Sequence, residues 1–221
     1  RPYNPAELYQ KKGWTVYDEM REDDQISALL HFKKNMILNQ GYYIECEDEE
    51  IKEFVEWNLE DINFQQALYE MLSAFDYGFS LTEIVHGQKK DYPDKICVAA
   101  LKTRAPHSFE IRQNDIGDIT EIVQYGGSGN ISVPIEKFLH YIHNGEFDNP
   151  YGESELNRGV YTAWWSKKAI IKFWNIYLER FGSPLAVGKY DSNKVAEQLL
   201  ADMRNALLNI QSKTAMLIPK E

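Results

Sequence analysis

Two histidines, His140 and His143, have the spacing in this sequence that comes closest to a metal site. On a helix, residues three apart share a face, and two imidazoles there could bind one metal ion. Residues 138–143 are rich in β-formers, however, and a strand would point the two rings to opposite faces. The sequence offers no evident third ligand, so no metal site is predicted.

Three carboxylates, Asp148, Glu153 and Glu155, lie in one short loop and are candidates for a catalytic acid and base. The sequence places no nucleophile or electrophilic stabiliser beside them. The same loop contains four residues whose types favour a turn, namely Asn149, Pro150, Tyr151 and Gly152. We therefore interpret the loop as a rigid turn that aims the next helix.

Other chemically suggestive patterns have structural explanations. The acidic run from Glu45 to Glu50 lacks the alternating spacing and the glycine of a calcium loop, so it indicates a solvated helix start. The glycines from Gly126 to Gly129 lack the residues of a phosphate-binding loop and indicate a turn. Cys46 and Cys97 match no metal or redox spacing, which favours two buried thiols. The sequence predicts neither an enzyme nor a bound cofactor.

Charge is divided unevenly along the chain. Residues 161–221 carry nine basic and five acidic side chains, whereas residues 1–160 carry fifteen basic and twenty-nine acidic ones. The first part cannot be a general DNA-binding surface, because it would repel the phosphate backbone. Such acidity suits either a protein with no nucleic-acid role or a channel through which DNA slides without adhering.

The length of 221 residues and the 43% hydrophobic content allow a sizeable core, in one domain or two small ones. No stretch reaches the roughly 18 apolar residues of a spanning helix, because Lys167, Lys168 and Lys172 interrupt the most apolar segment. We expect no membrane role. The chain begins at Arg1 without a leader pattern, so we expect an internal fragment.

The first part of the chain is predicted to be α+β. Two helical pieces should lead to Gly41, the second of them capped by Asp23 or Asp24. A short strand is expected at Tyr42–Cys46, followed by two amphipathic helices that end near Phe75. Short segments rich in β-formers then predict a mostly antiparallel sheet. Its strands are expected at Phe79–His86, Ile96–Leu101, Ser108–Arg112, Ile119–Tyr125 and Phe138–His143.

The segment Thr162–Phe181 is apolar around most of a helix. Its large side chains include Trp164, Trp165, Ile170, Ile171, Phe173, Trp174, Ile176, Tyr177 and Phe181. One narrow stripe is polar and consists of Lys168, Lys172, Asn175 and Glu179. Such a helix must be covered on several sides, and the cover is either a set of neighbouring subunits or the core of a monomer.

A small β-α-β module is predicted after Gly182 and Pro184, which end that helix. It should consist of a strand at Leu185–Lys189, a helix at Ser192–Gln211 and a strand at Thr214–Ile218. A unit of this length cannot be stable on its own burial alone. We expect it to pack against partners or against further sequence.

The loop and the long helix carry a resemblance to a known family. The residues concerned are Phe138, His140, Asn149–Ser154, Trp164, Trp165, Lys167, Lys168, Phe173, Trp174, Leu178–Gly182 and Pro184. Together they resemble the portal proteins of Mu-type tailed phages. Upstream, Tyr17, Asp18 and Met20 resemble the start of the portal wing. The resemblance covers nearly the whole chain and is most specific from Asn149 to Tyr190.

The resemblance implies a portal-like architecture. Residues 1–161 would form the wing, 162–182 the first stem helix and 183–221 a β-α-β clip, without the family's returning stem helix, tunnel loop and crown. Asn149–Gly152 would be the wing–stem turn. Stem packing would involve Trp164, Trp165, Phe173, Trp174, Tyr177 and Phe181, and tunnel-facing or intersubunit positions would be Lys168, Lys172, Asn175 and Glu179.

The resemblance also implies a function. The chain would be one subunit of a ring, commonly of twelve copies, at the capsid vertex of a virion assembled in the bacterial cytoplasm. Double-stranded DNA would pass through the ring without sequence specificity, and terminase, a head–tail adaptor and capsid protein would be partners. The alternatives are a structural or scaffolding module without a DNA channel, and a metal-assisted hydrolase that uses His140 and His143.

Overall fold

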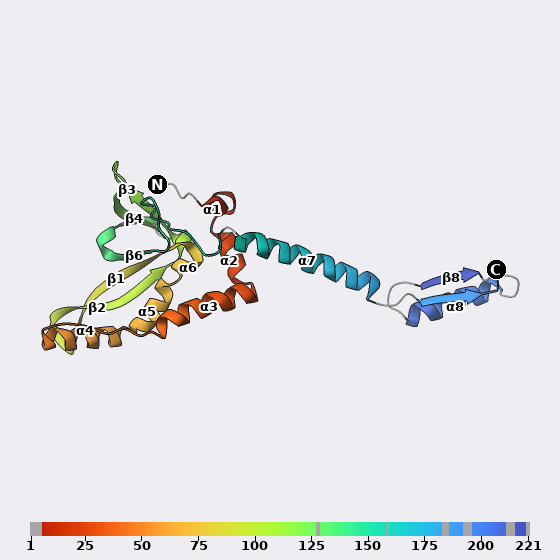
Figure 1. The fold of residues 1–221 in the computed structure, drawn as a ribbon, viewed down its shortest axis with the longest axis horizontal. Coiled ribbons are helices and arrows are strands. Elements are labelled where there is room, and N and C mark those ends of the chain that lie inside the picture. Colours follow the sequence, from red (N-terminus) through yellow and green to blue (C-terminus); the bar gives the residue numbers. More distant parts are fainter. Residues whose placement is uncertain are drawn as a thin grey trace. The chain divides into compact units, whose positions relative to one another are not determined.

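A computed structural model describes residues 6–126, 129–157, 159–182, 186–191, 196–210 and 215–219. The chain divides into two compact units, Arg1–Thr162 and Ala163–Glu221. Figure 1 shows the order of the elements along the chain. Helices and antiparallel strands are mixed in the first unit, so the α+β class is confirmed.

The N-terminal region contains three helices where the sequence predicted two helical pieces. They are α1 (Glu7–Lys12), α2 (Thr15–Arg21) and α3 (Asp24–Leu38). Gly13 separates the first two, since its φ of 69° ends α1. The predicted cap of α3 is confirmed, because the Asp23 side chain accepts hydrogen bonds from the backbone amides of Gln25 and Ile26.

The predicted strand at Tyr42–Cys46 is wrong. Among the described residues this segment pairs with no strand. Tyr42 instead packs edge-on against Phe64, with 5.3 Å between ring centroids, and Tyr43 is 83% exposed. A strand needs a hydrogen-bonding neighbour, which local sequence does not reveal.

The helices after this segment are α4 (Glu49–Asp61), α5 (Phe64–Met71) and α6 (Ala74–Tyr77). Asp48 caps α4 through the backbone amides of Glu50 and Ile51. The second predicted helix is thus split near Ser73 into α5 and α6. Helix α5 packs against the strands that follow, and α3 packs against α5.

The strands form two antiparallel sheets of three strands each, where the sequence predicted one sheet. The first has the order β2 (Tyr92–Arg104), β1 (Phe79–Lys89), β6 (Phe138–Ile142). The second has the order β3 (Phe109–Gln113), β4 (Ile119–Gly126), β5 (Gly129–Pro134). Strand β5 was not predicted, because it begins at Gly129 in the glycine-rich turn; Val133 nevertheless packs against the core.

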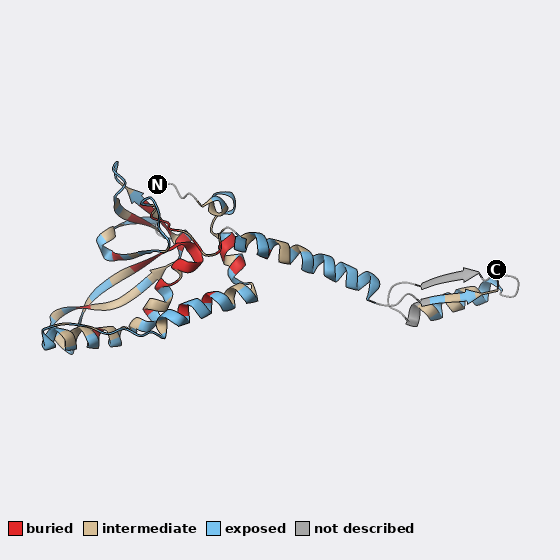
Figure 2. Cartoon of the chain, in the orientation of Figure 1, coloured by how far each residue is buried: buried red, intermediate tan, exposed pale blue. Residues whose placement is uncertain are grey.

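The core of the first unit lies between the two sheets. It is a cluster of Phe79, Leu81, Phe109, Ile111, Ile122, Phe138 and Tyr151. In Figure 2 the buried residues gather around α6, α2 and the start of β1. Tyr151 belongs to the predicted rigid turn, so the turn is part of the core.

The long helix α7 spans Gly159–Phe181. Beyond it, β7 (Ala186–Tyr190) and β8 (Ala215–Pro219) form a parallel pair with α8 (Glu197–Ile210) between them in sequence. A parallel pair needs a crossover, which α8 provides. The predicted β-α-β module is therefore confirmed, although Leu185, Ser192, Gln211 and Thr214 lie outside the described residues.

Candidate functional site

The two histidines fasten one loop to the first sheet. His140 lies in β6, and its Nε2 atom is 2.8 Å from the carbonyl oxygen of Pro150. Burial lowers the pKa of His140, against the opposing effect of that hydrogen bond. The Nε2 atom of His143 lies 3.0 Å from Oε1 of Glu155, and its ring packs against Phe75. Each imidazole thus holds a different part of residues 150–155.

The loop carboxylates do not come together as an acid–base pair. Asp148 is exposed, whereas Glu155 forms an ion pair of 2.9 Å with Lys33 of α3. Burial acts to raise the pKa of Glu155, but hydrogen bonds from Lys33 and His143 outweigh it and lower the pKa. Across the described ranges, no three His, Cys, Asp or Glu side chains are grouped as metal ligands would be.

Residues 149–152 form a compact turn built on Asn149. Its side-chain Oδ1 accepts a hydrogen bond from the backbone amide of Tyr151 at 3.1 Å, and its Nδ2 donates to the carbonyl oxygen of Gly152 at 3.0 Å. The backbone amide of Gly152 also donates to the carbonyl oxygen of Asn149 at 3.3 Å. An asparagine side chain that copies a backbone turn in this way fixes the loop locally.

The turn is locked against the junction between α6 and β1. Gly78 has a φ of 93° and Gly152 a φ of 53°, so both occupy backbone conformations that favour glycine. A Cβ on Gly152 would collide with the carbonyl oxygens of Gly78 and His143, and one on Gly78 would collide with that of Tyr151. The backbone amide of His143 donates to Gly78 O at 2.8 Å. Only glycines permit this approach of two backbones.

The segment that leads into α7 is bound to three helices. The backbone amide of Glu155 donates to the carbonyl oxygen of Phe75 at 3.0 Å, and the Ser154 hydroxyl donates to that of Asp76 at 2.6 Å. Tyr17 of α2 donates to Oδ1 of Asn157 at 2.8 Å. With the Lys33–Glu155 ion pair to α3, these contacts leave the segment little freedom before α7 begins.

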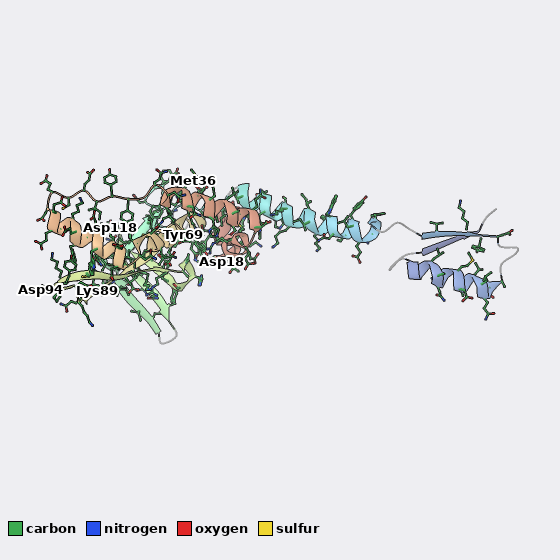
Figure 3. The ribbon with its side chains drawn as sticks, turned by 90° about the horizontal axis from the view of Figure 1, so that it is seen from below. Asp18, Met36, Tyr69, Lys89, Asp94 and Asp118 are labelled. Atoms are coloured by element: carbon green, nitrogen blue, oxygen red, sulfur yellow. The ribbon has the colours of Figure 1, made fainter. Side chains whose placement is uncertain are left out.

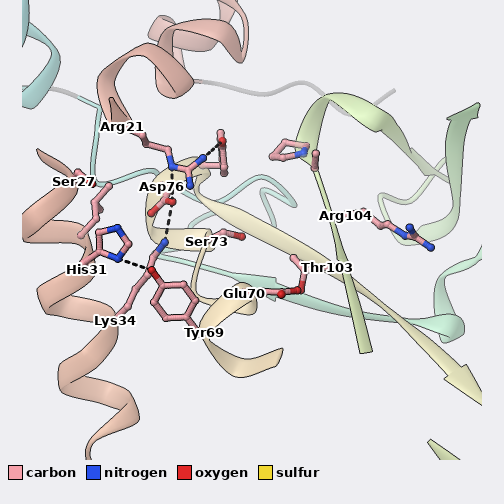
Figure 4. A pocket seen from close by; sticks show the side chains of 14 residues that line it. Arg21, Ser27, His31, Lys34, Tyr69, Glu70, Ser73, Asp76, Thr103 and Arg104 are labelled. Atoms are coloured by element: carbon pink, nitrogen blue, oxygen red, sulfur yellow. Dashed lines mark hydrogen bonds and ion pairs between the residues drawn. The ribbon is translucent and has the colours of Figure 1, made fainter. Parts of the chain in front are cut away.

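A buried ion cluster lies beneath this segment. Oδ2 of Asp76 is 2.9 Å from both Lys34 Nζ and Arg21 Nε, and Asp76 and Lys34 are 0% and 5% exposed. Figure 4 shows Asp76 between the two cations, with His31 and Tyr69 beside them in a pocket of about 350 Å³. By pairing with Arg21 of α2 and Lys34 of α3, the buried Asp76 joins these two helices to α6.

The aromatic side chains of α7 differ in exposure. Trp164 is only 7% exposed, and the Nζ atom of Lys168 lies 4.3 Å from the centroid of its ring. The others face solvent, as the exposed colour along α7 in Figure 2 shows. Their exposed fractions are 60% for Trp165, 70% for Phe173, 60% for Trp174, 54% for Tyr177 and 68% for Phe181. Figure 3 shows side chains standing away from the helix on all sides.

The polar stripe and most of the exposed aromatic side chains lie on opposite sides of α7. At about 100° per residue, Lys168, Lys172, Asn175 and Glu179 fall on one stripe. Phe173, Trp174, Tyr177 and Phe181 fall on the other side, where Tyr177 lies 6.0 Å from Trp174 and 5.1 Å from Phe181 between ring centroids. We call this second set the aromatic ridge. Among the described residues, no helix has the length and hydropathy to cross a membrane.

The sequence indicated the turn and the long helix but missed the features that fasten them. Gly78 directly precedes the predicted strand Phe79–His86, but nothing local showed that Gly152 would pack on it. In the sequence alone, Asp76 is an ordinary polar residue near the end of a predicted helix. Its partners Lys34 and Arg21 lie more than forty residues away in the sequence, so only tertiary structure reveals the cluster.

Comparison with known proteins gives one finding. The model of a family described as the portal protein of Mu bacteriophage matches residues 14–221. A search of curated proteins found no match to the chain. The matched family is structural rather than enzymatic, and it implies oligomeric assembly with phage head components. Because the match extends through both units, this chain belongs to the portal protein family of Mu-type bacteriophages.

Proposed function

We propose that this chain is one subunit of a ring-shaped channel at the capsid vertex, through which double-stranded DNA enters and leaves the head. The observation that carries the proposal is the exposure of α7. Its aromatic ridge and the neighbouring Ile170 and Leu178 present a long apolar surface to solvent. Monomeric soluble proteins rarely expose such a surface, and side-by-side copies of the helix in a ring would cover it.

The parts of the chain take different roles in this proposal. Residues 1–161 act as the wing, 162–182 as the first stem helix and 183–221 as the clip. The contacts of residues 149–157 make the wing–stem turn a stiff joint, because backbone and side-chain bonds both hold it. The residues before the stem helix are then held in the same way in every copy, as repetition of one interface around a closed ring requires.

DNA passes through the channel with little adhesion. Basic contacts to phosphate, repeated around a ring, would make sliding slow and strongly salt-dependent. The polar stripe of α7 carries two lysines and one glutamate among its four residues, and we assign these positions to the tunnel or to the neighbouring subunit. The ammonium group of Lys168 lies over the indole ring of Trp164, so it extends less far from the helix. The energy for DNA movement would come from a separate motor.

The partners follow from this arrangement. Terminase during packaging, and a head–tail adaptor afterwards, would dock on the clip at the mouth of the ring, and capsid protein would surround the wing. The ring, commonly of twelve copies, would assemble in the bacterial cytoplasm and remain in the virion. A scaffolding module without a channel is the competing function.

Electron microscopy of the full-length protein separates these two functions. A closed ring with an axial bore wide enough for duplex DNA is expected. A particle without a bore, or a compact monomer at micromolar concentration, would contradict the channel and favour the scaffolding module. Native mass spectrometry of the same sample gives the number of subunits.

A further inference from the structure

The loop from Asn144 to Asp148 holds an aromatic side chain in solvent at a conformational cost. Asn144, Phe147 and Asp148 have φ values of 47°, 55° and 54°. Left-handed backbone is unfavourable for residues other than glycine, particularly for a bulky one. Phe147 is nevertheless 97% exposed. Strain together with exposure of an apolar ring indicates a contact that a single copy of the chain does not make.

A groove adjoins this loop. Its volume is about 540 Å³, and it runs between the β3–β4 turn and residues 142–150. The apolar lining includes Ile116, which is 83% exposed, and Ile142, which is 36% exposed. Phe147 directly precedes Asp148, which lines this groove. We call the exposed Phe147 ring and the adjoining groove together the loop patch.

The rim of the loop patch is acidic. Asp118 and Asp148 line the groove, and Asp115 and Glu146 are exposed in the same two loops. Among the described residues that line the groove, none is Lys or Arg. The complementary partner is thus an apolar surface that carries basic side chains.

We propose that the loop patch receives helix α7 of a second copy of this chain. Helix α7 has the required chemistry, since it is apolar and carries four basic residues against one acidic residue. Its Lys172 and Arg180 are exposed and would lie near the acidic rim. The inference rests on the proposed ring, in which each α7 has a neighbour on both sides.

The position of the loop in the chain supports a neighbouring copy as the occupant. The strained residues immediately precede the locked segment 149–157 that leads into α7. Rotational symmetry therefore provides one such patch for every stem helix in a ring. Burial of the Phe147 side chain between neighbouring subunits would then offset the backbone strain at this residue.

Photo-crosslinking tests this contact in the full-length protein. The photoreactive residue p-benzoylphenylalanine replaces Phe147 in rings mixed from ¹⁴N- and ¹⁵N-labelled subunits. Mass spectrometry should find crosslinks from position 147 to residues 159–181 that join the two isotopes. The same probe at Ile96, which is 74% exposed on β2, is the matched control and should give no crosslink to α7.

The outcomes separate this inference from the proposed function. Rings in which position 147 crosslinks only within one copy, or only outside residues 159–181, overturn the contact and leave the channel intact. Unsubstituted protein that forms no ring overturns the proposed function itself.

A second variant gives an independent readout. Phe147→Gly removes the phenyl side chain and suits the left-handed backbone. The dissociated subunit should therefore unfold at the same temperature or higher. The dissociation constant of the assembly should nevertheless rise about ten-fold or more. A lower unfolding temperature with unchanged assembly would show that Phe147 serves the fold of one copy, and would overturn the proposal.

Discussion

The carbonyl oxygen of Gly78 occupies the space into which a Cβ of Gly152 would project. This contact joins the end of α6 to the turn that leads into α7, across more than seventy residues of sequence. The contact is made by backbone atoms alone. Its strength therefore depends on glycine at both positions.

Gly152→Ala should destabilise the first unit by about 3 kcal/mol or more, because the methyl group meets two carbonyl oxygens and the φ of 53° is unfavourable. Gly41→Ala is the matched control, since Gly41 has a φ of 69° and no atom near its Cβ position. Its cost should be about 1 kcal/mol. Chemical denaturation measures both values, and equal costs would show that the close approach is unimportant.

Asp76→Asn should destabilise the protein more than Lys34→Met. The first change leaves Lys34, which is 5% exposed, without its buried carboxylate and should cost about 3 to 5 kcal/mol. The second leaves Asp76 with Arg21 and should cost about 1 to 2 kcal/mol. The comparison uses denaturant midpoints at neutral pH. The reverse order would mean that the Lys34 side chain stabilises the fold through contacts other than its ion pair with Asp76.

Acidification should weaken the fold through His140. Its folded-state pKa lies below the ordinary value of 6.5 because the ring is buried. Protons then bind the unfolded chain preferentially as the pH falls below 6.5, so stability is full above that pH and declines below it. His140→Gln should show a shallower decline between pH 7.5 and 5. Thermal unfolding at several pH values tests this, and parallel curves for the two proteins would refute the role of His140.

Trp174→Ser should weaken assembly without weakening the first unit. Trp174 is 60% exposed on the aromatic ridge, so a single copy loses little when it is replaced. In a ring, loss of a buried tryptophan should cost about 2 kcal/mol or more per interface. Ile96→Ser, at a comparably exposed position on β2, should assemble normally. Sedimentation velocity measures assembly, and identical profiles would argue against stem contacts through the ridge.

Local sequence predicted the elements that depend on local chemistry. The cap at Asp23, the acidic start of α4, the end of α7 before Gly182 and the β-α-β module all follow from side-chain preferences within a few residues. The turn at Asn149 was likewise recognisable, because asparagine, proline and glycine act there through their own backbone preferences.

The remaining features depend on partners distant in sequence. Strand β6 pairs with β1, nearly sixty residues earlier, and so divides the strands into two sheets. Tyr42–Cys46 contains β-forming residues but finds no neighbouring strand in the described chain. Phe147 is unremarkable in sequence, and its significance comes from a positive φ and almost complete exposure.

Hydroxyl-radical footprinting of the full-length protein tests whether α7 forms the contacts between subunits, by comparing the assembled and dissociated forms. The account predicts that Trp165, Phe173 and Trp174 are strongly labelled in dissociated subunits, as their exposure of 60–70% requires, and protected in the assembly. Ile96 should be labelled equally in both forms. Unchanged labelling of all three aromatic residues on assembly would contradict a ring held together through α7.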